Sequence, residues 1–65
     1  MLTRCKINGS IRKYEPITIR QILKRYQENP NHVIIELNGK ITKDLDYQIQ
    51  ENDEIEWMYY MAGGH

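Results

Sequence analysis

Apolar residues gather along this chain in short runs that predict five β-strands. The first two runs flank Asn8-Gly9, a tight-turn pair whose residues both tolerate positive φ. The run 33–37 is β-branched and nearly continuous, which is typical of a central strand buried on both faces. A second Asn-Gly pair at 38–39 separates it from a very short fourth run. The predicted strands are 2–7, 11–15, 33–37, 40–41 and 54–60.

One amphipathic helix is predicted between the second and third strands. Thr18 is a candidate N-cap, and Gln21, three residues later, completes a capping-box pattern. Pro30 disfavours helical geometry at the residue before it, so the sequence 29–31 is expected to end the helix. Apolar residues recur at helical spacing and form one stripe that can pack on a sheet. The stripe consists of Ile19, Ile22, Leu23 and Tyr26.

This order of elements predicts an α+β fold, in which one helix packs on one face of a mixed four- to five-stranded sheet. The crossover through the helix is expected to place the third or the last strand parallel to the first by a right-handed connection. This is the β-grasp arrangement. Residues 1–60 are expected to form a single domain, and residues 61–65 a flexible C-terminal tail. The predicted core is Cys5, Ile7, Ile19, Ile22, Leu23, Tyr26, Val33, Ile35, Leu37, Ile55 and Trp57.

Two segments lack a simple helix or strand pattern or leave apolar residues facing outward. The stretch 42–50 has no clean period, and we expect packing of Leu45, Tyr47 and Ile49 to hold it as an irregular turn. In the last strand, alternation turns Ile55, Trp57 and Tyr59 inward. Met58 and Tyr60 then face outward, where Ile34 and Ile41 could extend an apolar surface on the open sheet face. Such a surface suits partner docking, although scattered apolar residues on a bare sheet face need no function.

Composition excludes several classes of protein. Nine basic residues balance nine acidic ones, so no global field directs the chain to nucleic acid or an anionic membrane. No apolar run approaches the roughly 20 residues of a membrane span, and Arg4 and Lys6 interrupt any signal-peptide pattern. Cys5 is the only cysteine and alternates with Ile7 on the predicted core face, so it is expected to be buried and inert. We expect a soluble cytoplasmic domain.

No catalytic or metal site is predicted. His32 and His65 are too far apart in sequence, and no cysteine or carboxylate shares ligand spacing with them. The acidic residues of the C-terminal half are expected to form a solvated face, because no Ser, Cys or His lies nearby to complete a catalytic group. These residues are Asp44, Asp46, Glu51, Asp53, Glu54 and Glu56. We therefore do not expect an enzyme or a bound cofactor.

The chain ends in Met61-Ala62-Gly63-Gly64-His65. Glycine has no Cβ, so a Gly-Gly pair can enter a channel too narrow for other residues. A terminal glycine carboxylate is also an unhindered acyl group for activation. The alternative interpretation is a flexible end without a function. His65 opposes activation, because it covers the carboxylate of Gly64.

The ordered combination of these motifs resembles the ThiS family of sulfur carriers, along essentially the whole chain. The related MoaD carriers tend to be longer. The matching features are the hairpin Ile7-Asn8-Gly9, the helix opening at Thr18, the segments 33–39 and 52–56, and the closing Met61-Ala62-Gly63-Gly64. The resemblance implies a ubiquitin-like β-grasp fold and a carrier that catalyses nothing. Each motif alone is weak; their order together with the Gly-Gly end is more specific.

The resemblance also implies a mechanism and a set of partners. An E1-like adenylyltransferase of the ThiF/MoeB type would use ATP to adenylate the carboxylate of Gly64, and sulfur from a persulfide would convert it to a thiocarboxylate. Ala62, Gly63 and Gly64 would enter the active site of the partner. A sulfur-accepting synthase, of the thiazole synthase type in thiamine biosynthesis, would receive the sulfur.

His65 departs from the family pattern, in which the chain usually ends at the second glycine. A JAMM-type metalloprotease could remove it at the Gly64-His65 bond, or it could be the first residue of a histidine tag. As a third possibility, the fold serves binding alone. The alternative functions are therefore a non-covalent β-grasp interaction module, or a ubiquitin-like modifier that forms isopeptide bonds through Gly64.

Overall fold

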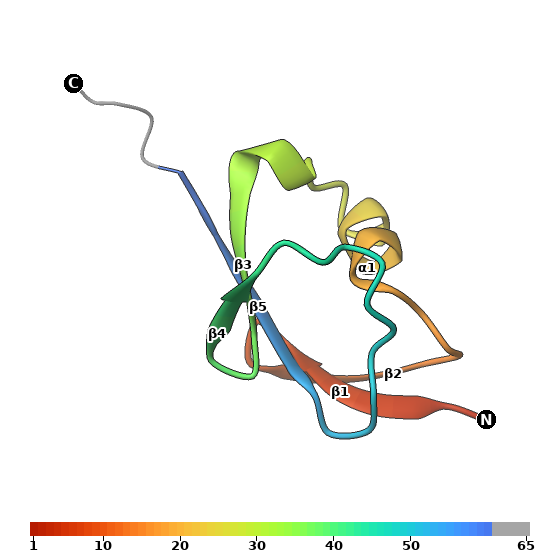
Figure 1. The fold of residues 1–65 in the computed structure, drawn as a ribbon. Helices are drawn as coiled ribbons and strands as arrows, with labels where there is room; N and C mark the ends of the chain where they lie inside the picture. The colour runs from red at the N-terminus through yellow and green to blue at the C-terminus, as the bar shows by residue number, and fades with distance from the viewer. Residues whose placement is uncertain (61–65) are drawn as a thin grey trace.

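Five strands and one α-helix form the fold of the computed structural model, which describes residues 1–60 (Figure 1). A short 3₁₀ turn, Pro30–His32, connects the helix to the third strand. The predicted elements are confirmed, with shifts of at most one residue at the strand ends. The elements are β1 (Thr3–Ile7), β2 (Ser10–Tyr14), α1 (Ile19–Arg25), β3 (Val33–Leu37), β4 (Lys40–Thr42) and β5 (Glu54–Tyr59).

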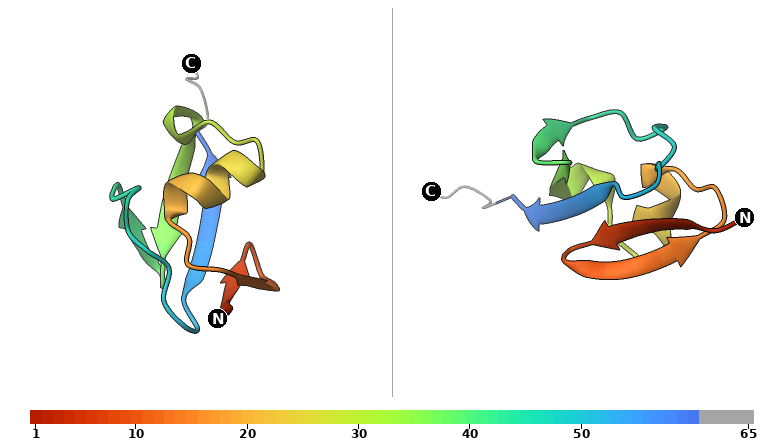
Figure 2. Two further views of the ribbon diagram at one scale, coloured as in Figure 1. Left: turned by 90° about the vertical axis from the view of Figure 1, so that its right-hand side faces the viewer. Right: turned by 90° about the horizontal axis from the view of Figure 1, so that it is seen from below.

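The strands form one mixed sheet in the order β2-β1-β5-β3-β4. The last strand, β5, runs parallel to β1 and antiparallel to β3, so the expected parallel crossover ends at β5. The strand 33–37 is an interior strand, between β5 and β4, but the expectation that it is buried on both faces is wrong. The middle of the sheet is β5, and α1 covers only one sheet face, so Ile34 on the other face stays half-buried (Figure 2).

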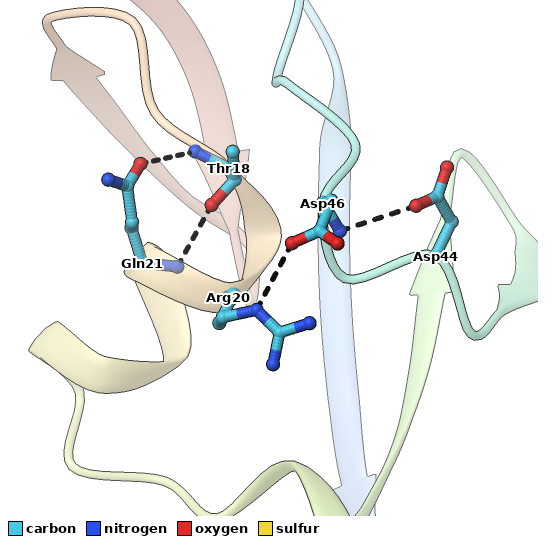
Figure 3. Close-up of polar contacts among 5 residues, drawn as sticks. All are labelled: Thr18, Arg20, Gln21, Asp44 and Asp46. Carbon is cyan, nitrogen blue, oxygen red and sulfur yellow. Dashed lines mark hydrogen bonds and ion pairs between the residues drawn. The ribbon is translucent and has the colours of Figure 1, made fainter.

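The capping box predicted at the start of the helix is present (Figure 3). The Thr18 side chain accepts a hydrogen bond from Gln21 N, and the Gln21 side chain accepts one from Thr18 N. The helix ends earlier than expected, at Arg25, with Tyr26 as C-cap and Gln27 at a φ of 58°. Pro30 does not end the helix but begins the 3₁₀ turn, a position that suits its fixed φ.

The core lies between α1 and the sheet and contains two residues that the periodicity did not assign to it, Ile17 and Ile49. Both are buried because segment 45–49 runs beside the approach to the helix. Ile49 N donates to Ile17 O at 2.9 Å, and an isolated bridge joins Thr18 to Gln48. The buried apolar residues are Cys5, Ile7, Ile17, Ile19, Ile22, Leu23, Val33, Ile35, Ile49 and Ile55, while Tyr26, Leu37 and Trp57 are only partly buried.

Segment 43–49 is irregular, as predicted, but backbone hydrogen bonds hold it as well as packing. Arg20 N donates to Leu45 O at 2.9 Å, and Ile19 N donates to Tyr47 O at 3.1 Å. An exposed ion pair joins Arg20 to Asp46 at 3.1 Å in the same place (Figure 3). Since these bonds use the free N–H groups of the first helical turn, the loop also caps α1.

Asp53 contradicts the expectation that all carboxylates of the C-terminal half are solvated. Its side chain is only 8 % exposed and accepts three hydrogen bonds: from Asn38 Nδ2 at 2.9 Å, Tyr47 Oη at 2.7 Å and Gln50 N at 2.8 Å. Burial by itself would raise the pKa of Asp53, but the bonds from Asn38, Gln50 and Tyr47 outweigh it and lower the pKa below its ordinary value. Asp53 is therefore a structural carboxylate that joins the β3–β4 turn to the approach to β5.

Within residues 1–60, no helix has both the length and the apolar character needed to cross a membrane.

Candidate functional site

The C-terminal end of β5 is the structural base of the Gly-Gly tail. It lies at the far end of the molecule from the N-terminus (Figures 1 and 2). Two contacts tie it to the connection between α1 and β3: Tyr60 N donates to His32 O at 3.3 Å, and Tyr59 Oη donates to the Glu28 carboxylate. The bond to Glu28 raises the pKa of Tyr59. Sequence patterns gave no signal for Glu28, because it lies in a polar segment without periodicity.

The prediction that Tyr59 points into the core is wrong. Its side chain is 61 % exposed, although it lies on the same side of β5 as buried Ile55 and half-buried Trp57. The alternation of the strand is therefore correct. The helix does not cover Tyr59, because α1 stops at Arg25 and does not reach the end of β5.

Exposed apolar side chains gather on the open sheet face beside this strand end. Met58 and Ile34 are register partners on β5 and β3, so their side chains are neighbours. Ile41 on β4 is 68 % exposed and Met58 is 46 % exposed. Ile34, Ile41 and Tyr60 contribute to the wall of a hollow of about 170 Å³. We call Ile34, Ile41, Met58 and Tyr60 the sheet-face patch; the structure thus brings together the four residues that the sequence suggested for docking.

An acidic band borders the sheet-face patch. Glu36 on β3 lies directly opposite Glu56 on β5, and Glu54 lies two residues earlier on the same face of β5. Like charges in such positions repel each other. The ion pairs found among residues 1–60 join Met1 to Glu15 and Arg20 to Asp46, so neither Glu36 nor Glu56 is paired within this part of the chain, whereas Glu54 lies opposite Lys6 of β1. A basic group on a partner would relieve this repulsion.

Catalytic and metal-binding groups do not assemble in the described residues. No group of three or more His, Cys, Asp or Glu side chains in residues 1–60 could hold a metal ion. Cys5 is 2 % exposed, as predicted, and burial, with a smaller effect of Asp53, raises the pKa of its thiol. A buried thiol of this kind is a poor nucleophile.

The predicted sulfur-bearing and tail residues, Ala62, Gly63, Gly64 and His65, lie outside the described residues. Tyr60 is the last described residue, and three residues separate it from Gly64 in the sequence.

Comparison with known proteins identifies the family. The model of the ThiS family matches residues 5–64, which is nearly the whole chain. The chain belongs to the ThiS family. This membership supports a role as a small sulfur carrier rather than an enzyme.

A solved structure confirms the fold expected for a ThiS family member. The crystal structure of the thiamine biosynthesis protein ThiS from Geobacter metallireducens is similar, with a TM-score of 0.77 and 23 % sequence identity. The match covers 95 % of this chain and 100 % of the Geobacter chain. A search of curated proteins found no match. The ubiquitin-like β-grasp fold is thus established. At 23 % sequence identity, the match shows the fold alone.

Proposed function

We propose that this protein is a sulfur carrier in biosynthesis, most simply that of the thiamine thiazole, and that Gly64 bears the sulfur. The observation that carries the proposal is the family match, which continues through the tail to Gly64. The description of the Geobacter relative as a thiamine biosynthesis protein supports this pathway. We expect the protein to work in the cytoplasm, where such biosynthesis takes place.

The chemistry needs a free carboxylate at Gly64. A carboxylate is a poor electrophile, so an E1-like adenylyltransferase of the ThiF/MoeB type first joins it to AMP from ATP and releases pyrophosphate. The terminal sulfur of a persulfide then attacks the acyl carbon and displaces AMP. A thiol next cleaves the new S–S bond reductively, which leaves the thiocarboxylate on Gly64. A sulfur-accepting synthase of the thiazole synthase type takes this sulfur.

His65 must be absent before the first step, because an amide carbonyl at Gly64 cannot be adenylated. A JAMM-type protease is the proposed partner for this cleavage if His65 is native. The carrier itself contributes no catalytic group and binds no cofactor in this mechanism.

The sheet-face patch is the proposed docking surface for the adenylyltransferase. Its apolar side chains adjoin the base of the tail, so docking there brings Gly63 and Gly64 close to the active site of the partner. The acidic band beside the patch would favour a partner with basic side chains at the rim.

Intact-mass measurement tests the chemistry. We compare the chain ending at Gly64 with the full chain, each incubated with ATP, a persulfide donor, a thiol and the ThiF-type enzyme from the same genome. The shorter chain should gain the mass difference between sulfur and oxygen, and the full chain should remain unchanged. A control chain ending at Gly63 should react much more slowly. No gain in mass by the shorter chain with an active enzyme would contradict the proposal, and a ladder of heavier conjugates would indicate a protein modifier.

Alanine substitution tests the docking surface. Met58 is 46 % exposed, so a partner can bury about half of its side chain, and Met58→Ala removes that contact. We expect a loss of about 1 kcal/mol in binding free energy, or about fivefold in Kd for the adenylating enzyme. Ile11→Ala is the matched control, because Ile11 is 48 % exposed on the same sheet face but lies on the edge strand β2. Equal Kd values for the two variants would exclude the sheet-face patch as the docking surface.

A further inference from the structure

Charge is divided unevenly along this neutral chain. Residues 1–27 contain seven of the nine basic residues and a single acidic residue, Glu15. Residues 28–65 contain the remaining two basic residues and the other eight acidic ones. The first part forms β2 and β1 at one edge of the sheet together with α1, and the second part forms β5, β3 and β4. The neutral total therefore conceals two regions of opposite charge.

Two arginines of the basic region contact tyrosine side chains, one at a hydroxyl and one at a ring face. Arg12 on β2 lies opposite Cys5, so it is on the side of the sheet that faces α1. Its Nε donates to Tyr26 Oη at 3.4 Å. The Arg25 guanidinium lies 5.3 Å from the centre of the Tyr14 ring, a cation–π geometry. We call Arg12, Tyr14, Arg25 and Tyr26 the arginine–tyrosine cluster.

Packing against Trp57 supports this cluster. The Tyr26 ring meets the half-buried ring of Trp57 edge-on, at 5.2 Å between centroids and 80° between planes. Burial, and then the neighbouring Tyr26 hydroxyl, raises the pKa of Tyr14 to about 12. The charged groups that the cluster presents are its two arginines, and its aromatic rings support them.

Both arginines remain available to a partner. Arg12 and Arg25 are exposed, as is Lys24 beside them on α1, and none of the three takes part in an ion pair found among residues 1–60. Contact with the two tyrosines already restricts the arginine side chains, so binding would cost less side-chain entropy. Arginine and tyrosine are also the residues that most often dominate binding energy at protein interfaces.

We propose that the arginine–tyrosine cluster is a docking surface for an acidic segment of a partner protein. Complementary charge favours such a segment, because the few carboxylates of a short partner segment can all lie within the basic region of this protein. An extended nucleic acid would continue past the cluster toward the acidic region, where repulsion acts over a Debye length of about 8 Å.

This surface is separate from the one proposed for activation. The cluster lies on the helix side of the sheet, whereas the sheet-face patch lies on the opposite side, so two partners could bind at once. Binding at the arginine–tyrosine cluster needs no activated tail. Its success or failure is therefore independent of the sulfur chemistry at Gly64.

The test is a titration of the full ¹⁵N-labelled chain with a capped hexaglutamate peptide, followed by NMR at low and at physiological salt. The largest shift changes should fall at residues 12–14 and 24–26. The double variant Arg12→Gln/Arg25→Gln should weaken binding at least fivefold. Lys40→Gln/Lys43→Gln is the matched control: it removes the same charge from exposed lysines of the acidic region and should change Kd less than twofold.

Three outcomes would overturn the proposal. The first is equal weakening by the two double variants, which would mean attraction by overall charge alone. The second is a shift map centred away from the cluster; this map comes from the unaltered chain, so it decides the question even if a variant fails to fold. The third is tighter binding of a hexathymidylate oligonucleotide than of the peptide at the same residues, which would assign the surface to nucleic acid.

Discussion

Replacing Asp53 by Asn should destabilise the protein more than any other isosteric change of a carboxylate in residues 1–60. The two oxygens of Asp53 accept from Asn38, Tyr47 and Gln50. An Asn side chain that keeps its oxygen toward Tyr47 and Gln50 directs its NH₂ group at the amide NH₂ of Asn38. Asn38 cannot turn its amide over without cost, because its Oδ1 accepts from Glu54 N at 2.8 Å. The substitution therefore leaves two donors facing each other in a buried place.

The magnitude follows from these bonds. A hydrogen bond to a charged group contributes about 1.5–3 kcal/mol, and a buried donor left without an acceptor costs about 1–3 kcal/mol. Since part of the network survives, we expect Asp53→Asn to lower the free energy of unfolding by about 2–4 kcal/mol at pH 7. A domain of this length has a total of about 3–10 kcal/mol at 0.05–0.15 kcal/mol per residue. The variant should be close to the limit of folding.

The pH dependence has a defined sign. The folded pKa of Asp53 is lowered from 3.8, so the unfolded chain takes up the proton first as the pH falls. The stability that the ionised Asp53 contributes is thus fully present above the unfolded pKa and is lost as the pH falls through the folded value. Below about pH 4 the difference between the wild type and Asp53→Asn should therefore shrink.

Urea unfolding at several pH values, followed by the fluorescence of Trp57, measures both effects, because Trp57 is the only tryptophan. Glu54→Gln is the matched control: it neutralises the next residue, which is exposed, and should change the free energy by less than about 0.5 kcal/mol. Equal stability of Asp53→Asn and Glu54→Gln at pH 7 would refute the structural role of the Asp53 carboxylate. A difference that stays constant down to pH 3 would show that the charge of Asp53 is not the cause.

Two further predictions concern the helix start and the buried thiol. Thr18→Ala removes one bond of the capping box and should lower the free energy of unfolding by about 1 kcal/mol, measured by urea unfolding; a change near zero would mean that the loop 45–49 alone holds the helix start. Cys5 should react with a thiol reagent such as DTNB only slowly in the folded protein and rapidly in urea, and fast reaction without urea would contradict its burial.

Local chemistry made most of the fold predictable. The Asn8-Gly9 and Asn38-Gly39 turns place Gly9 and Gly39 at φ values of 87° and 85°, as such turns require. The Thr18 capping box formed as its spacing indicated. These features depend on neighbours in sequence, so a pattern of a few residues carries the information.

The errors came from contacts between distant segments. Burial of Asp53 depends on Asn38 and Tyr47, which approach it only in the folded chain. Burial of Ile17 depends on a loop about 30 residues away in sequence, at Ile49. The exposed patch could be predicted from strand alternation alone, whereas the contact of Glu28 with Tyr59 could not, because 31 residues separate them and neither position has a distinctive motif.

The length of α1 connects the fold to the presentation of the tail. Seven helical residues span about 10 Å, whereas the six residues of β5 span about 20 Å, so the helix covers only part of the strand. β1 pairs with β5 only at Glu54 and Ile55, and Asn8 accepts one further bond from Trp57 N. Beyond Trp57, β5 therefore has both faces open and one edge unpaired with β1. A partner can surround this end of the strand from three sides, which a longer helix over Tyr59 would prevent.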